Sequence, residues 1–323
     1  MPLSGHTIPP LDAKQSEDAQ LFRSLRGFYE SSSPKTERQR MFYDTSAFKK
    51  PLEGTRDDRF HAVVMLLPSE SKRLIAKGTV QVPEIQRVLK DGWFIVSRGV
   101  TPAYVLEELI GELGPKQNYT AGIVTEGRLG TIIPEDQVGP WVFKDGKLVD
   151  VSAPEALGQM QAKDVSIKGA NAVDPNGNIG VFSGDYAGGT VGGIWGTLTA
   201  RGAHWIAPVS LERLIPDVIA AHFASGNHRW DLTMGQAAGM MPVVTAEVVT
   251  EIQALEILTG VTAVHIASGG VGGSEGAVML ALEGDKQSVT AAFELCESVK
   301  GEPGITGANL QDYVREPDTA PVR

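Results

Sequence analysis

Short apolar runs alternate with helical stretches across glycine-containing loops, and this order is the feature that most constrains the fold. Ala62–Leu67, Trp93–Val96 and His204–Pro208 are continuous apolar runs of strand length. Helical stretches follow, among them Pro102–Leu113 and Thr190–Arg201. The order strand, loop, helix, strand is typical of parallel strands joined by crossover helices. The sequence therefore predicts an α/β fold with a Rossmann-like parallel sheet and crossover helices.

The composition narrows the class of protein. Of the 323 residues, 42% are hydrophobic, which suffices for a core and excludes a wholly disordered chain. The net charge of −10 argues against a broad nucleic-acid-binding face. The single cysteine, Cys296, permits neither an intrachain disulfide nor a thiolate metal cage. No apolar run approaches the roughly 20 residues that span a bilayer, and residues 1–20 lack a signal peptide's apolar stretch, so we expect a soluble, cytoplasmic protein without a membrane partner.

Three segments differ in texture. Residues 1–60 are polar and charge-dense, and we interpret them as an arm or lid, with a solvated tail as the alternative. Residues 61–230 carry the pattern of an α/β ligand-binding core. Residues 231–323 combine an expected helix at Thr245–Thr259, two strands around a glycine-rich bend and a helix at Gln287–Val299. This last order resembles a small ferredoxin-like α+β unit, followed by a C-terminal tail.

The first informative motif lies between the strand Trp93–Val96 and the helix after it. Its residues are Ser97, Arg98, Gly99, Val100 and Thr101. Glycine lets the backbone approach a ligand closely, and the amides that open a helix point toward an anion. The two hydroxyls and the planar cation of Arg98 suit phosphate or carboxylate. The alternative is an ordinary turn in which glycine relieves crowding and Thr101 caps the helix.

A second motif follows the apolar stretch Tyr119–Thr125, which we predict to be another strand. Glu126, Gly127 and Arg128 come directly after it, where open α/β sheets place their ligands. The equally simple alternative is that Glu126 is a solvent-exposed carboxylate in a turn, without a ligand.

Farther along the chain, Leu211–Ala224 is expected to be one helix capped by Ser210.

Residues 164–217 resemble the core of methylthioribose-1-phosphate isomerases and of the related initiation factor 2B regulatory subunits. The resemblance rests on short motifs: Gly169-Ala170-Asn171, Asn176-Gly177-Asn178-Ile179, Ser183-Gly184, Ala200-Arg201-Gly202 and Ala207-Pro208-Val209-Ser210. The loop at Ser97–Thr101 is similar to the glycine-containing loop of ribose-5-phosphate isomerases, glucosamine-6-phosphate deaminases and CoA transferases. The resemblance implies an isomerase/CoA-transferase-like fold over about half the chain. The pattern also matches uncharacterised microbial proteins, for which it implies no reaction.

This sequence departs from the isomerase pattern at the position that performs proton transfer. The family's aspartate is replaced by Asn171, and an amide has no protonation step near neutral pH. The lysine of the family's later loop is also missing, with Val181 in that region. Either the protein performs other chemistry, or Asp174, Asp185 or Glu126 supplies the carboxylate.

A rival within the same group comes from Glu126. Residues 125–130 resemble the segment in which the glutamate of CoA transferases forms an acyl-CoA anhydride, although the asparagine of that segment is absent. A carboxylate nucleophile needs a small neighbour, so that a bulky thioester can approach it. Glu126 would be that nucleophile.

Together these loops predict one ligand pocket. We expect Glu126, Asp185 and Asn171 to be its catalytic residues. The substrate-binding residues would be Ser97, Arg98, Gly99, Thr101, Arg128, Lys168 and Gly184. Because ligands lie beyond the carboxyl ends of the strands, these loops should converge on one cavity. Asp185 would stay ionised beside a helix start and Lys168.

The sequence predicts neither a metal nor a cofactor. The six histidines lack metal-binding spacing, and the glycine-rich run 269–276 has no accompanying phosphate-loop lysine, so we interpret it as a hairpin bend. Cys296 is expected to be an inert core thiol.

Three functions remain open. The first is an isomerase-like enzyme that transfers a proton on a small anionic, phosphorylated metabolite. The others are CoA-transferase or acyl-CoA hydrolase-like activity through Glu126, and a non-catalytic metabolite sensor or assembly protein. We also expect a homo-oligomer, because the N-terminal arm and the C-terminal unit both offer exchange between copies.

Overall fold

The computed structural model describes residue 42 and residues 59–111 and 114–311. These residues belong to one compact unit, Met41–Arg323. The N-terminal arm that the sequence predicts over residues 1–60 lies almost wholly outside the described residues.

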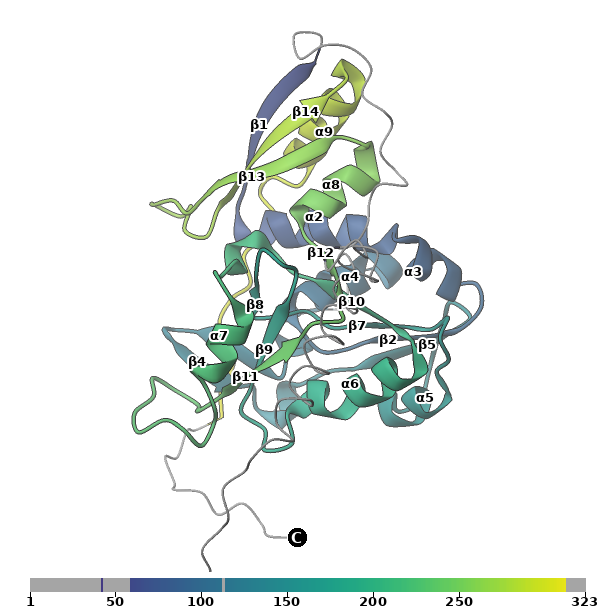
Figure 1. Ribbon diagram of the computed structural model, residues 1–323, viewed down its shortest axis with the longest axis vertical. Coiled ribbons are helices and arrows are strands. Elements are labelled where there is room, and N and C mark those ends of the chain that lie inside the picture. Colours follow the sequence, from purple (N-terminus) through teal and green to yellow (C-terminus); the bar gives the residue numbers. More distant parts are fainter. Residues whose placement is uncertain (1–41, 43–58, 112–113, 312–323) are drawn as a thin grey trace, which may run out of the picture. The chain divides into compact units, whose positions relative to one another are not determined.

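A six-stranded sheet forms the centre of the fold (Figure 1). Its strand order is β12-β10-β7-β2-β5-β6, and its first four strands run parallel while β5 and β6 are antiparallel. The strands are β2 (Trp93–Val96), β5 (Trp141–Lys144), β6 (Lys147–Val149), β7 (Val165–Ile167), β10 (His204–Pro208) and β12 (Glu247–Val249). The fold is therefore mixed α/β, with a parallel portion as the sequence predicts and an antiparallel edge.

Helices cover both faces of this sheet (Figure 1). One face carries α2 (Pro68–Val80), α3 (Pro83–Val88) and α4 (Val100–Ile110), and the other carries α5 (Ala153–Gln159) and α6 (Gly189–Arg201). Successive residues of β2 enter the two cores in turn: Phe94 and Val96 pack toward the first set of helices and Ile95 toward the second. This alternation follows from the two-residue period of a strand, and it explains why the parallel strands are apolar throughout.

A smaller antiparallel sheet has the order β1-β14-β13. It consists of β1 (Phe60–Leu66), β13 (Thr262–Ser268) and β14 (Val278–Gly284), and it packs against α8 (Glu251–Thr259) and α9 (Lys286–Ser298). The predicted strand at the start of the α/β pattern thus pairs with the C-terminal strands and not with the central sheet. Helix α2 joins the two parts, because Leu74 enters the small core while Ile75 and Ala76 enter the large one.

The remaining elements surround the parallel strands' carboxyl ends. They are the hairpin β3 (Gly122–Thr125) and β4 (Arg128–Thr131), the sheet of β8 (Ala172–Val173), β9 (Ile179–Ser183) and β11 (Gly239–Val243), helix α7 (Val218–Phe223), and the 3-10 turns η2 (Lys116–Tyr119), η3 (Pro134–Asp136) and η4 (Leu211–Arg213). The predicted strand Tyr119–Thr125 therefore starts later and belongs to a separate hairpin, because Lys116–Tyr119 forms a helical turn.

Two predicted helices are shorter than the sequence suggests. Over Thr245–Thr259, residues Glu247–Val249 form β12, and α8 starts only after Thr250, whose hydroxyl accepts the N–H of Ile252. The β-branched pair before Thr250 extends the sheet, and the threonine cap then starts the helix. Over Leu211–Ala224, Pro216 interrupts the helix, because proline offers no N–H. Asp217 caps the second part, α7.

No helix in the described part of the chain has both the length and the apolar character to cross a bilayer.

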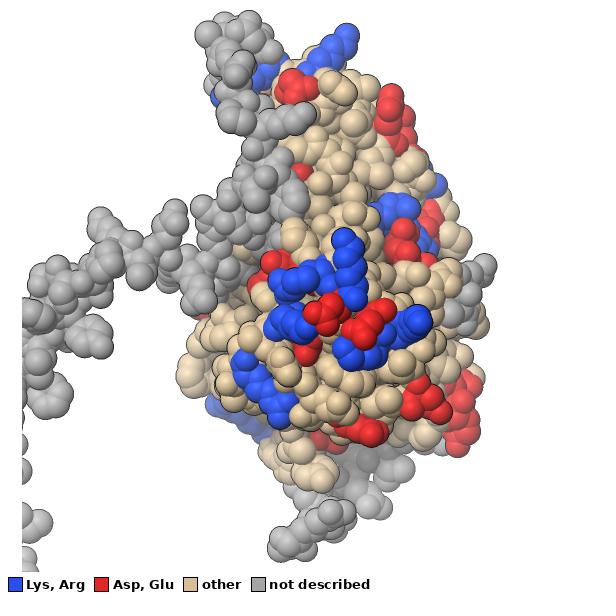
Figure 2. Space-filling model, turned by 90° about the vertical axis from the view of Figure 1, so that its right-hand side faces the viewer, with Lys and Arg blue, Asp and Glu red and all other residues tan. Residues whose placement is uncertain are grey.

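On the face shown in Figure 2, positive and negative side chains lie beside one another. A nucleic-acid-binding surface requires an extended positive field. The mixture of charges on this face provides none.

Candidate functional site

Two adjacent cavities lie at the carboxyl ends of β2 and β7. The first has a volume of about 730 Å³ and the second about 820 Å³. Both are lined by Gly99, Gly122, Lys168, Asn171 and Phe182, which form their common wall. The position agrees with the rule that ligands of α/β sheets bind beyond the carboxyl ends of the strands. We therefore regard the two cavities as one candidate site with two compartments.

The amino end of α4 opens into this site. Its N-cap residue is Gly99, and no side chain caps the helix. The helix begins Val100-Thr101-Pro102, and the N–H of Ala103 already bonds to the carbonyl of Gly99. Because proline has no N–H, the amides of Val100 and Thr101 are the donors that the first turn leaves for a ligand. Helix amides in this position attract anions.

Close packing explains the glycines on either side of this helix start. A Cβ on Gly99 would lie 3.1 Å from the ring of Pro102, and a Cβ on Gly169 would lie 3.1 Å from the same ring. The loops after β2 and β7 therefore meet at Pro102, where a larger residue at either glycine would require the proline ring to shift slightly. This contact places the residues that follow Gly169 beside the α4 amides.

Lys168 follows β7 and lies in the common wall of the two cavities. Its Nζ is 3.9 Å from the position that a Cβ on Gly99 would take. The one hydrogen bond that Nζ donates within the described residues is a long one, 3.5 Å, to the carbonyl of Gly169. Burial, and then repulsion from Arg213, lower the pKa of Lys168 to about 8. The amine is thus a cation that the protein itself leaves unneutralised.

The first cavity has further positive charge. Arg213 lines it and donates to the carbonyl of Ala170 at 2.6 Å. Lys72 also lines it, but its Nζ lies 2.6 Å from the carboxylate of Glu212 and 3.0 Å from the carbonyl of Pro68. Burial lowers the pKa of Lys72, and the charge of Glu212 opposes that shift. The compartment therefore holds a paired lysine next to an unpaired one.

The second cavity brings Arg98, Asn171 and Asp185 together. Arg98 is held by the carbonyl of Val138 and the side chain of Gln137, both at 3.2 Å, and burial lowers its pKa. Asn171 accepts the N–H of Phe182 at 3.0 Å through Oδ1, and within the described residues its amide nitrogen donates to no other group. That nitrogen is a donor available to a ligand.

Asp185 accepts hydrogen bonds from backbone amides of its own loop. Its Oδ1 accepts the N–H of Ala187 at 2.8 Å and the N–H of Gly189 at 3.1 Å, at the start of α6. The predicted catalytic carboxylate is thus the group that satisfies the amides of this loop. A carboxylate engaged in this way is less free to accept a substrate proton.

Thr120 adds an unsatisfied polar group. It lines the second cavity, it is 1% exposed, and its hydroxyl has no hydrogen-bond partner in the described part of the chain. A buried hydroxyl without a partner costs free energy, so native proteins rarely retain one that serves nothing. The hydroxyl oxygen itself is covered, so Thr120 is an unsatisfied polar group behind the second cavity and not a donor that the cavity presents.

Most of the predicted site residues line these cavities, and three do not. Arg98, Gly99, Thr101, Lys168, Asn171, Gly184 and Asp185 are in the lining. Ser97 is buried behind the loop. Glu126 and Arg128 belong to the β3–β4 hairpin, and neither is in the lining of these two cavities. The predicted convergence on one cavity thus fails for Glu126, because the strand before it is not part of the parallel sheet.

Glu126 occupies the tight turn of that hairpin. Its φ is 52°, in the left-handed region, and Thr125 pairs with Arg128 across the turn. Its neighbour Thr125 reaches the first cavity, while Glu126 itself is exposed. The position matches the solvent-exposed turn carboxylate that the sequence left open as the alternative.

Sequence reasoning missed several residues of the site. Lys72, Thr120 and Arg213 line it, and so do the chain segments around Ile305 and Gln311. Lys72 belongs to a helix with an ordinary amphipathic pattern, which gives no sign that this lysine lines a site. Thr120 had no motif around it. Two residues of the C-terminal tail, the charged Glu302 and the apolar Ile305, were the signals that could have pointed to a docked segment.

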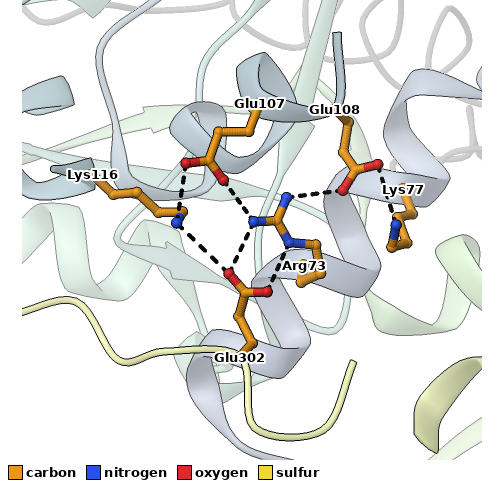
Figure 3. Close-up of polar contacts among 6 residues, drawn as sticks. All are labelled: Arg73, Lys77, Glu107, Glu108, Lys116 and Glu302. Atoms are coloured by element: carbon orange, nitrogen blue, oxygen red, sulfur yellow. Dashed lines mark hydrogen bonds and ion pairs between the residues drawn. The ribbon is translucent and has the colours of Figure 1, made fainter. Parts of the chain in front are cut away.

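Residues 301–311 form a C-terminal strap along both cavities. Its first anchor is Glu302, which binds Arg73 on α2 and faces Lys116 (Figure 3). Arg73 also binds Glu107 and Glu108 of α4, and both cations lie over the ring of Tyr104. The second anchor is on β4, where the N–H of Gln311 bonds to the carbonyl of Thr131 and Ile132 pairs with Leu310.

Between these anchors, Gly304, Ile305 and Thr306 line the first cavity. Ile305 also packs against the core beneath the helices of the central sheet. The strap is therefore held at both ends, and its middle forms part of the lining of the first cavity.

Among the described residues, no group of three or more His, Cys, Asp or Glu side chains is arranged to hold a metal ion. The chain matches no family model, no curated protein and no solved structure. Any function assigned to this chain therefore rests on the geometry of the site itself.

Proposed function

We propose that this protein binds a small anionic, phosphorylated metabolite and acts on it as an enzyme. The observation that carries the proposal is the unneutralised amine of Lys168 at the open end of α4. The amides of Val100 and Thr101 and the cation of Lys168 provide the donors and the charge that a phosphate or carboxylate group requires. The amide nitrogen of Asn171, which lies in the common wall of the two cavities, supplies a further donor.

The chemistry proposed from the sequence changes with this geometry. Asp185 is engaged by backbone amides and Glu126 lies outside the two cavities, so neither is well placed for proton transfer. Lys168 is the ionisable group that the site presents to a ligand from both compartments. An isomerase-like proton transfer would then use this amine, whose pKa of about 8 suits a general base near neutral pH.

The relation to the isomerase/CoA-transferase-like group is also part of the proposal. Parallel strands β2, β7, β10 and β12 with helices on both faces support a Rossmann-like core. The antiparallel order β1-β14-β13 with α8 and α9 supports a ferredoxin-like unit. The exposed position of Glu126 gives no support to the acyl-transfer alternative.

A binding panel with turnover detection tests the proposal. Wild-type protein is screened by thermal shift against phosphorylated and carboxylated metabolites, and each hit is incubated and analysed by mass spectrometry. We expect phosphorylated compounds to raise the melting temperature, and at least one of them to be converted. Lys168→Met should remove the shift, while Lys147→Met, a change at an exposed lysine of β6, should leave it intact.

Each negative result has a defined meaning. Absence of any anion-dependent shift would contradict the site. Binding without conversion across the panel would contradict the enzyme and favour the metabolite-sensing alternative. Self-association remains a separate prediction, and light scattering at micromolar concentration checks it, since a monomer at all concentrations would refute it.

A further inference from the structure

Two lysines line the candidate site, and their surroundings differ in one respect. Lys72 is held by Glu212 at 2.6 Å, an ion pair that opposes the loss of its proton. Lys168 has no carboxylate within ion-pair distance among the described residues, and its charged neighbour is Arg213. A lysine beside another cation in a partly dry cavity loses its proton readily and becomes a nucleophile.

We propose that Lys168 is a nucleophilic amine that forms an imine with the carbonyl carbon of a small carbonyl-bearing anion. This inference rests on the proposed function, because the α4 amides must first hold the anionic group. The carbonyl carbon would then lie at the common wall of the two compartments, where Nζ is located. The substrate class is an aldehyde or ketone that also carries a phosphate or carboxylate.

The bond changes balance without any further reactant. The lone pair of neutral Nζ attacks the carbonyl carbon, and the C=O electrons move to oxygen. A proton passes from nitrogen to that oxygen, which gives a carbinolamine. Loss of the hydroxyl group with a second proton as water leaves the C=N bond, and water reverses the reaction. The neutral amine that starts this sequence is accessible, because the pKa of Lys168 is about 8.

Neighbouring groups fit the same reaction. The amide nitrogen of Asn171 is a donor on the same wall, and it can hold the carbonyl or carbinolamine oxygen without ionising. An amide at this position also avoids the carboxylate that would keep Lys168 protonated. The presence of Asn171 in place of the family's aspartate is therefore consistent with imine chemistry at Lys168.

Reductive trapping tests the inference on the full chain. The protein is treated briefly with glyoxylate, or with glyceraldehyde 3-phosphate, in the presence of sodium cyanoborohydride. The reductant delivers hydride to the imine carbon and leaves a stable secondary amine, which peptide mass spectrometry locates. We expect Lys168 to be modified at least about tenfold faster than Lys72 in the same sample, because the Lys72 amine is engaged by Glu212 and the Lys168 amine has only a long hydrogen bond to a carbonyl.

Lys168→Arg separates this inference from the proposed function. Arginine retains the cation but forms no imine under these conditions, so the variant should still show a thermal shift with inorganic phosphate and should lose the adduct. Lys168→Met should lose both. A phosphate-dependent shift in the wild type with no preference for Lys168 over Lys72 would overturn the imine and leave the anion site standing. Absence of both the shift and the adduct would overturn both.

Discussion

At the scale of single residues, the charge of Lys168 decides what this site is. Lys168 is half-buried, and a cation partly withdrawn from water without a counter-charge costs stability, so proteins retain such groups mainly where function requires them. Lys168 lies beside the helix start that the Ser97–Thr101 motif predicts, and Asn171 lies with it in the common wall of the two cavities. These features support the proposed anion site.

Replacement of Lys168 by methionine should stabilise the free protein at pH 7 by about 1–3 kcal/mol, because it removes a half-buried charge that has no counter-charge among the described residues. The pKa of the lysine falls from 10.5 in the unfolded chain to about 8 in the folded one. Between these values the unfolded chain binds more protons, so the wild type gains stability as pH rises from about 8 to 10.5. The advantage of the variant should shrink across that window.

Urea denaturation in a buffer without phosphate measures both effects. Lys147→Met, at an exposed position, is the matched control and should differ little from the wild type at either pH. A Lys168→Met variant less stable than the wild type at pH 7 would show that the ammonium group has a favourable partner.

At the scale of elements, the contact between α2 and α8 couples the two cores. A Cβ on Gly78 would lie 2.5 Å from the Cα of Ala254, which is closer than atoms can approach. Glycine is used here for proximity of the two helices and not for flexibility. The sequence could not reveal this reason, because it depends on a helix far along the chain.

Gly78→Ala should therefore destabilise the protein by about 1–3 kcal/mol, since the helices must move apart. The same change at Gly193, on the exposed side of α6 with open space around it, should stabilise by up to about 1 kcal/mol. Equilibrium denaturation of the two variants gives opposite signs if the α2–α8 contact is as tight as described. Equal stabilisation of both would refute it.

The strap is the second element whose role can be measured. Glu302→Gln weakens the link to Arg73 and Lys116 (Figure 3), and we expect a loss of about 1–2 kcal/mol in stability. Hydrogen exchange should rise in peptides covering residues 303–311, because one of the two anchors is lost. Glu297→Gln, at an exposed position on α9, is the control. Unchanged exchange in the Glu302 variant would mean that the β4 anchor alone holds the strap.

Sequence patterns predicted the local elements well and the distant pairings poorly. The apolar runs of β2 and β10 and the helix α6 were recognisable, because hydrophobic periodicity and chain-breaking residues are local properties. The pairing of Phe60–Leu66 with the small sheet could not be predicted, since strand pairing over more than 200 residues leaves no local signal. The predicted position of Glu126 in the cavity was wrong for the same reason. A strand-like run identifies a strand, but not the sheet to which the strand belongs.

At the scale of the whole molecule, α2 contributes to both cores, so the small unit and the central sheet should unfold together. The chain provides a separate probe for each part. All five tryptophans lie between residues 93 and 230, whereas Cys296 is buried in the small core, where burial raises the pKa of its thiol to about 12.

Tryptophan fluorescence and thiol labelling should therefore report the same urea midpoint. Protection of Cys296 should be lost only with the global transition, because its side chain is buried in the core that α2 shares with the central sheet. Labelling at urea concentrations well below the fluorescence midpoint would show that the small unit opens independently. Such a result would contradict the coupling assigned to α2.

The anion site is tested most directly by a crystal structure of the protein with selenate, a tetrahedral anion whose position anomalous scattering reveals. We expect one peak within hydrogen-bond distance of Lys168 Nζ and of the N–H groups of Val100 or Thr101, and its disappearance in Lys168→Met. Peaks confined to other surfaces, with the start of α4 empty at saturating selenate, would contradict the site.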